Sequence, residues 1–157
     1  VYPVRGQIIG TETLPNVLSA CISTNDCYIA QKYHGEIIIG STTEEKGFDV
    51  EVTPSAMKTL SMGAVRALPF LEKVKVKRVW SGLRPGTSDE LPILGPVNEL
   101  EGYLNACGHF RTGILTSPIT GLLISEMILG NALSYPIEPF LLSENRSNHS
   151  YHESTLK

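Results

Sequence analysis

The chain has 157 residues, of which 41% are hydrophobic and 18% are charged, and its formal net charge is −3. These values are those of an ordinary globular protein with a real hydrophobic core. The negative net charge leaves no basic excess that would attract phosphate groups, which argues against nucleic acid as a partner.

The number and spacing of the cysteines indicate the cellular compartment of the protein and whether it binds a metal. Cys21, Cys27 and Cys107 are an odd number and form no Cys-x-x-Cys pair, which argues against a zinc site and a disulfide framework. We therefore expect reduced thiols, no metal and a cytoplasmic protein. No signal-peptide pattern begins at Val1. Polar residues interrupt the apolar run at 114–129, which indicates a buried helix rather than a membrane span.

The first predicted elements are strands. Val4–Gly10 has the pattern of one strand, and Cys27–Lys32 and Glu36–Ser41 have the pattern of a hairpin. Gly35 lies in the turn between them and suits a positive φ.

A helix and a further strand follow. Thr53 is a good N-cap, Pro54 suits the first helical position, and Pro69 should end the helix. Val74–Trp80 is predicted to be a strand. Arg84–Pro92 contains Pro-Gly and Ser-Asp pairs, which are typical of a loop.

The last predicted elements are a short strand and a helix. Tyr103–Cys107 forms the strand, and Thr116 or Ser117 caps a helix that has Pro118 just inside it and Gly130 at its end. Strands dominate and one helix is inserted among them, so the predicted class is α+β. After Pro136 the chain is rich in Ser, Asn, His and Glu and has no periodicity, which predicts a mobile tail.

Two glycine-bracketed segments, Gly82–Thr87 and Gly108–Ile114, contain the candidate binding residues Arg84 and Arg111. A guanidinium forms a bidentate pair with a carboxylate and keeps its proton. The alternative for a loop arginine is an ordinary surface residue. Tyr28 is a third candidate, since its hydroxyl can donate to a carboxylate, although an aromatic at a strand position is also common in a core or at an edge.

In the second segment a strand ends, glycine-flanked residues turn, and a helix begins. Unpaired N–H groups and the helix dipole at such a turn favour negative charge. Gly113 removes a side chain where a ligand ring could approach. The alternative is an ordinary strand-to-helix turn in which His109 is satisfied by its neighbours.

Taken together, short segments in the same order resemble the C-terminal portion of glycine oxidase and the D-amino-acid oxidase family. That family includes the hydrogen cyanide synthase and sarcosine oxidase β-type subunits. The resemblance covers about residues 1 to 130. The segments are 3–7, 27–29, 35–42, 47–49, 67–69, 80–87, 91–96 and 108–115.

The resemblance implies an FAD-dependent oxidoreductase that removes a hydride from the carbon bearing an amine and leaves an imine. It implies a small amino acid or amine as substrate, with Arg84 and Arg111 on its carboxylate and Tyr28 beside it. It also implies a set of residues that line the flavin. These are Gly82, His109, Phe110, Arg111, Thr112, Gly113, Ile114 and Leu115.

One departure from the family is large. None of the 14 glycines forms the Gly-x-Gly-x-x-Gly loop that holds a dinucleotide pyrophosphate. We therefore expect an N-terminal dinucleotide-binding half, as a partner subunit or in a longer gene product, or a homo-oligomer. We assign residues 1–98 to a partial substrate domain, with an antiparallel or mixed sheet. Residues 99–133 are assigned to a strand and helix that complete the FAD domain, and 134–157 to the tail. The alternative is a non-catalytic fragment or interaction module that binds no FAD alone.

Overall fold

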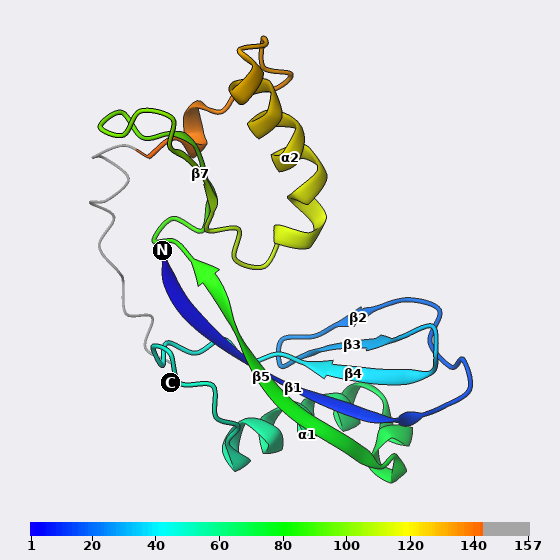
Figure 1. Ribbon diagram of the computed structural model, residues 1–157. Coiled ribbons are helices and arrows are strands. Elements are labelled where there is room, and N and C mark those ends of the chain that lie inside the picture. Colours follow the sequence, from blue (N-terminus) through cyan, green and yellow to red (C-terminus); the bar gives the residue numbers. More distant parts are fainter. Residues whose placement is uncertain (143–157) are drawn as a thin grey trace. The chain divides into compact units, whose positions relative to one another are not determined.

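The computed structural model describes residues 1–142 (Figure 1). The chain forms two compact units. Unit 1 consists of Val1–Tyr2 and the chain from Arg84 onward, and unit 2 consists of Pro3–Leu83. Strands and helices occur in both units, so the predicted α+β class is confirmed.

A five-stranded sheet is the framework of unit 2. Its order is β2-β3-β4-β1-β5, and the pairs β1–β4, β2–β3 and β3–β4 are antiparallel. The strands are β1 (Tyr2–Thr13), β2 (Ile22–Ser23), β3 (Tyr28–Gln31), β4 (Glu36–Gly40) and β5 (Val76–Gly86).

The predicted hairpin is confirmed by β3 and β4. The Lys32 N–H donates to the Glu36 carbonyl at 2.8 Å, and Gly35 in the turn has a φ of 97°. This positive φ is open to glycine and strained for other residues. The turn fixes the register, which places Tyr28 opposite Gly40.

Helix α1 (Pro54–Ala67) begins and ends where its signals predict. The Thr53 side chain accepts a hydrogen bond from the Ala56 N–H at 3.3 Å, and the helix stops two residues before Pro69. A 3-10 turn, η1 (Pro69–Lys73), was not predicted and leads the chain into β5.

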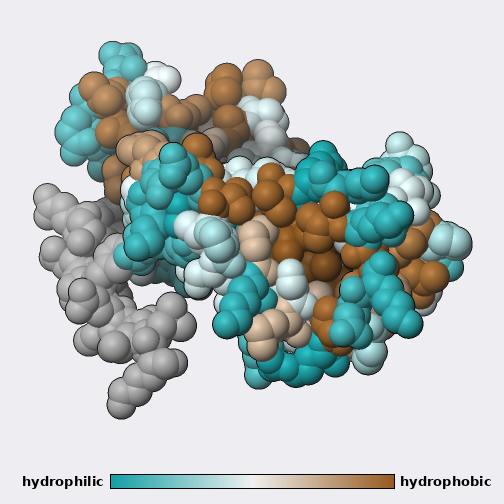
Figure 2. All heavy atoms as spheres, turned by 90° about the horizontal axis from the view of Figure 1, so that it is seen from below, coloured by the Kyte–Doolittle hydropathy of each residue, from teal (hydrophilic) through white to brown (hydrophobic). Residues whose placement is uncertain are grey.

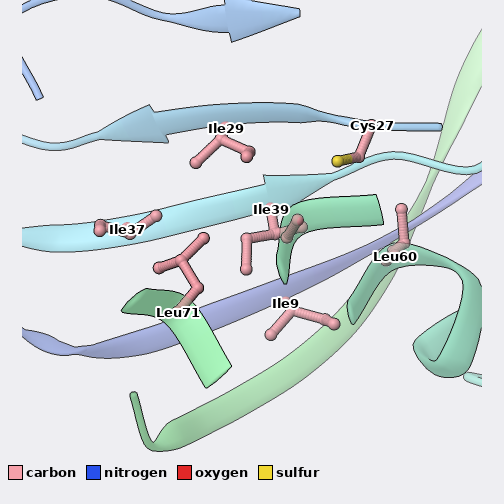
Figure 3. Packing of buried hydrophobic residues seen from close by; sticks show 8 residues of the cluster. Ile9, Cys27, Ile29, Ile37, Ile39, Leu60 and Leu71 are labelled. Atoms are coloured by element: carbon pink, nitrogen blue, oxygen red, sulfur yellow. The ribbon is translucent and has the colours of Figure 1, made fainter. Parts of the chain in front are cut away.

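One face of the sheet packs against α1 and η1 and forms the core of unit 2 (Figure 3). Strand residues of this face alternate with residues that point to the opposite face. The buried cluster comprises Ile9, Cys27, Ile29, Ile37, Ile39, Leu60, Ala64 and Leu71.

Buried Arg5 holds the chain that leads into α1 against the sheet. Its guanidinium donates to Glu44 and to Asp49, each at 2.6 Å. The Gln7 side chain also accepts from the Thr53 N–H at 2.7 Å, next to the helix cap. Loop position and helix start are therefore fixed by polar side chains of β1.

A second charged pair lies on the sheet at Glu36. Arg78 donates from Nε and Nη2 to the two carboxylate oxygens of Glu36, at 2.8 and 2.7 Å, and stacks on Trp80. These hydrogen bonds hold the pKa of the Glu36 carboxyl below its usual range, although burial acts in the opposite direction.

We expect Glu36→Gln to lower the free energy of unfolding at neutral pH by an amount that shrinks in acid. A carboxyl whose pKa is lowered by folding stabilises the protein above its unfolded pKa, about 4.3. This stabilisation is lost as the pH falls through the lower folded value. Denaturant unfolding from pH 7 to pH 3 checks this, with Glu45→Gln at an exposed position as the charge control. A difference that stays constant over this range would contradict it.

The predicted loop at Arg84–Pro92 is wrong in its first part, because β5 continues to Gly86. In Figure 1 the start of β1 lies beside the end of β5, and the two strands are neighbours in the sheet order. Proline is tolerated there because β5 lies at the end of the strand order, where the missing N–H costs no ladder bond.

Unit 1 contains a hairpin and a helix. The antiparallel strands are β6 (Ile93–Pro96) and β7 (Leu104–Cys107), and helix α2 (Gly113–Leu129) follows them. Gly130 ends α2 with a φ of 67°, as its sequence position predicts.

The predicted start of this helix at Thr116 or Ser117 is wrong, because Thr112 is the N-cap. Pro118 therefore lies within the helix and offers no N–H to the Ile114 carbonyl four residues earlier. The Ser117 hydroxyl donates to that carbonyl at 2.9 Å, which compensates for the missing bond.

The start of the predicted tail is folded. A 3-10 turn, η2 (Glu138–Phe140), follows buried Ile137, and Leu141 lies close to Gly95 of β6. Apolar contact with β6 thus orders residues that composition alone marks as a tail. The rest of that tail, 143–157, lies outside the described residues.

Candidate functional site

A backbone hydrogen bond joins the two arginine-bearing segments within unit 1. The Phe110 N–H donates to the Pro85 carbonyl at 3.0 Å. Pro85 follows Arg84, which is half-buried at the end of β5, and Phe110 precedes Arg111, which is exposed. The bond thus joins the backbones that carry the two predicted carboxylate ligands, although they are 27 positions apart in the sequence.

A close contact and a strained turn stabilise this junction. Gly108 has a φ of 74°, and a Cβ added to it would lie 2.6 Å from Cγ2 of Thr87. Phe110 has a φ of 46°, a left-handed conformation that is uncommon outside glycine. Backbone strain of this kind persists where surrounding contacts over-determine it, and it clusters at functional sites.

We expect Gly108→Ala to destabilise the chain by roughly 1–3 kcal/mol, because the new methyl meets Thr87 and the φ is unfavourable. We also expect it to lower the flavin content of the complex with a dinucleotide-binding half. Gly47→Ala is the matched control, since Gly47 has a φ of 57° and nothing lies within 4 Å of its added Cβ. Thermal melting and flavin absorbance measure both effects. Equal losses in the two variants would show that the contact with Thr87 contributes nothing.

The start of α2 offers backbone donors. The Thr112 hydroxyl donates to the His109 carbonyl at 2.9 Å, instead of accepting from the helix. The first-turn N–H groups of a helix have no carbonyl partner within it, and here they belong to residues 113–115. No acidic residue lies in this turn. The turn therefore suits the negative edge of a ligand.

Two large apolar side chains stand beside these donors. Ile114 is 95% exposed and Leu115 is 82% exposed. Exposed aliphatic groups next to unpaired N–H groups are chemically suited to a ring system with apolar faces and a hydrogen-bonding edge. The isoalloxazine ring of a flavin has this character, so the residues at the start of α2 fit that group.

His109 is held against α2. One of its ring nitrogens lies 3.0 Å from the Thr120 hydroxyl, and its Cβ is 3.2 Å from the place of a Cβ on Gly113. The imidazole thus has a hydrogen-bond partner, as expected for an ordinary strand-to-helix turn in which neighbours satisfy His109. It lines a groove of about 480 Å³ beside α2 and β7, together with small residues such as Ser117 and Gly121.

Tyr28 and Gly82 are placed differently. Tyr28 belongs to unit 2, where it is half-buried on β3. Gly82 is exposed on β5, and nothing lies within 4 Å of its added Cβ. Of the predicted site residues, the structure joins the segments of Arg84 and Arg111 and adds the start of α2 to them.

Thr87 and Gly40 were missed by the sequence reasoning. The contact between Thr87 and Gly108 has no local sequence signal. Gly40 could have been found, since counting outward from the predicted turn at Gly35 places it opposite Tyr28.

Residues 1–142 contain neither a metal-binding cluster nor a membrane-spanning helix. No group of His, Cys, Asp or Glu residues there could hold a metal ion. In the same range no helix is long and apolar enough to cross a membrane.

The sheet with a helix on one face, the hydrogen-bonded arginine segments and the exposed start of α2 fit part of a flavin-dependent oxidoreductase. A family model described as FAD dependent oxidoreductase matches residues 1–127, and the chain belongs to this family. The expected family and the expected cofactor, FAD, are thereby confirmed.

Two relatives and one solved structure refine this assignment. Hydrogen cyanide synthase subunit HcnC of Pseudomonas aeruginosa is 60% identical over 141 residues, which are 90% of this chain and 34% of the relative. Glycine oxidase of Geobacillus kaustophilus is 34% identical over 146 residues, which are 92% of this chain and 39% of the relative. The crystal structure of that oxidase superposes with a TM-score of 0.86 at 34% identity, over 91% of this chain and 39% of the other. The chain thus spans between a third and two fifths of their length.

Proposed function

We propose that the chain is the substrate-binding part of an FAD-dependent enzyme that oxidises the C–N bond of glycine or another small amino acid to an imine. The hydrogen bond between Phe110 and Pro85 is the observation that carries the proposal, because it fixes the backbones of Arg84 and Arg111 in one place. The similarity to a glycine oxidase supports glycine or a close analogue as the substrate.

Each residue has a defined part in this proposal. Arg84 and Arg111 bind the substrate carboxylate, which orients the Cα–H bond for transfer. Tyr28 lies beside the substrate. Gly82 and residues 109–115 receive the cofactor, with the N–H groups at the start of α2 on its negative edge. When bound, FAD supplies the acceptor for the hydride. A neutral substrate amine makes a general base unnecessary.

A dinucleotide-binding half completes the enzyme, in the same polypeptide or as a partner subunit. The share of the relatives that this chain spans supports this, and so does α2, whose only fully buried residue is Leu123. In this proposal residues 1–98 serve the substrate and 99–133 complete the FAD domain. The cytoplasmic location remains a prediction from the cysteines.

The test is to express this chain together with the dinucleotide-binding half and record the flavin spectrum. Bleaching of the flavin by glycine without oxygen, with little bleaching by methylamine, is the expected result, because methylamine has no carboxylate for the arginines. A complex that binds no flavin would favour the non-catalytic interaction module.

A further inference from the structure

We propose that Gly40 is a positioning residue for the oxidation, because it lets the ring of Tyr28 lie flat on the sheet and so sets the place of the Tyr28 hydroxyl. The inference rests on the proposed function, since it gives Tyr28 its place beside the substrate. It concerns a residue that contacts neither substrate nor cofactor in that proposal.

The contact is between cross-strand neighbours. Tyr28 on β3 and Ile8 on β1 both pair with Gly40 on β4, so Gly40 lies between two strands. A Cβ added to Gly40 would lie 2.9 Å from both Cζ and Oη of Tyr28, and 3.1 Å from Cε1. The hydroxyl end of the ring therefore lies directly over the Gly40 backbone.

The requirement for glycine here is one of space. Gly40 is buried, and it is not among the glycines with positive φ. The φ of Gly40 is thus open to an alanine, but the space next to its Cα is not. Ordinary contact begins at 3.4 Å, so a methyl at Gly40 would displace the phenol of Tyr28 by about 0.5 Å or more.

The face on which this contact lies is the one that α1 leaves uncovered. Ile29 follows Tyr28 on β3, and Ile39 precedes Gly40 on β4. Both isoleucines point into the core (Figure 3). Strand alternation sends Tyr28 to the other face. A side chain in a strand usually stands away from the sheet, but here the phenol extends along it from β3 across β4.

This arrangement matters because a hydrogen bond is short and directional. A hydroxyl held over Gly40 has one defined position, and donation to a carboxylate weakens steeply once distance or angle departs from the optimum. Gly40 thus acts through Tyr28, without contacting the reactants.

A kinetic double-mutant cycle in the full enzyme, this chain with its dinucleotide-binding half, tests the role in catalysis. We expect Tyr28→Phe to lower kcat/KM for glycine roughly 10- to 100-fold, the effect of losing a hydrogen bond to a charged group. Gly40→Ala should cause a loss of similar size. In the Tyr28→Phe background it should change kcat/KM within about twofold. Multiplicative losses would overturn the proposal.

A stability cycle tests the contact without turnover. Gly40→Ala should lower the melting temperature of the holoenzyme when Tyr28 is present, and much less in the Tyr28→Leu background, where the ring is gone. The matched control is Gly10→Ala, because its Cβ would lie 3.1 Å from the ring of Trp80 and 2.6 Å from Oε1 of Glu36. Its cost should be the same in both backgrounds.

The possible outcomes distinguish failure of the proposed function from failure of the positioning role of Gly40. If the unaltered enzyme oxidises no amino acid, the proposed function fails, and the role of Tyr28 fails with it. If it turns over glycine but the stability losses of Gly40→Ala and Tyr28→Leu are additive, the positioning role alone fails. If Gly40→Ala does not fold, folding of the double variant Tyr28→Leu/Gly40→Ala supports the contact, and its failure to fold overturns it.

Discussion

Arg84→Ala is expected to weaken transition-state binding of an amino acid by about 2–4 kcal/mol, the cost of removing one partner of a charge-assisted pair. Arg84 is half-buried at the end of β5, next to the Pro85 carbonyl that accepts from Phe110. The effect should therefore fall on kcat/KM for glycine.

The controls for Arg84 separate substrate binding from folding. Arg84→Lys should restore activity only in part, since an ammonium cannot form the planar bidentate pair. An amine without a carboxylate should lose little with either variant, and the flavin content should stay near that of the unaltered enzyme. Arg111→Ala, at an exposed position, should cost less than Arg84→Ala. Equal losses for glycine and for the amine would assign Arg84 a structural role.

Local signals predicted the elements whose ends are fixed locally. The hairpin of β3 and β4 follows from alternation around Gly35, and α1 follows from the cap at Thr53 and the stop at Pro69. In each case the deciding interaction joins residues close in sequence, such as the Thr53 side chain and the Ala56 N–H. Such interactions can be inferred without a fold.

The misplaced boundaries depend on partners distant in sequence or on a compensating bond. The last residues of β5 belong to a strand that neighbours β1 in the sheet, and this placement overrides the turn signal of Pro85-Gly86. Helix α2 can begin before Pro118 because the Ser117 hydroxyl donates to the Ile114 carbonyl, to which proline has no N–H to donate. Neither effect has a signature in a short window.

The same distinction between local and distant interactions decides which parts of the candidate site could be predicted. The two arginines were found through the resemblance, which works because their glycine-bracketed segments are specific. The bond from Phe110 to Pro85 and the contact of Gly108 with Thr87 are tertiary, so spacing in the sequence carries no information about them. The place of Tyr28 over Gly40 lies between these cases, because the register of a hairpin can be counted from its turn.

The chain expressed alone, without the proposed dinucleotide-binding half, is expected to bind FAD weakly or not at all and to self-associate. Its proposed cofactor residues reach only the flavin ring, and none of its glycines forms the Gly-x-Gly-x-x-Gly loop that holds a dinucleotide pyrophosphate. Helix α2 is apolar on nearly all sides, yet Ile128 and Leu129 near its end are exposed as well as the first turn. Apolar residues also reach the surface elsewhere, between polar ones (Figure 2).

A helix that is hydrophobic all round is stable in water only when other chain covers it. Sedimentation of the chain alone should therefore show dimers or larger species, and adding the dinucleotide-binding half should replace them with a yellow complex. Replacing Ile128 and Leu129 by lysine should reduce self-association of the isolated chain and also weaken that complex, because the same surface serves both. Lys58→Glu on the exposed side of α1 is the control and should change neither. A monomer that binds FAD stoichiometrically without the other half would contradict the expectation, since the flavin ring contacts alone would then suffice for tight binding.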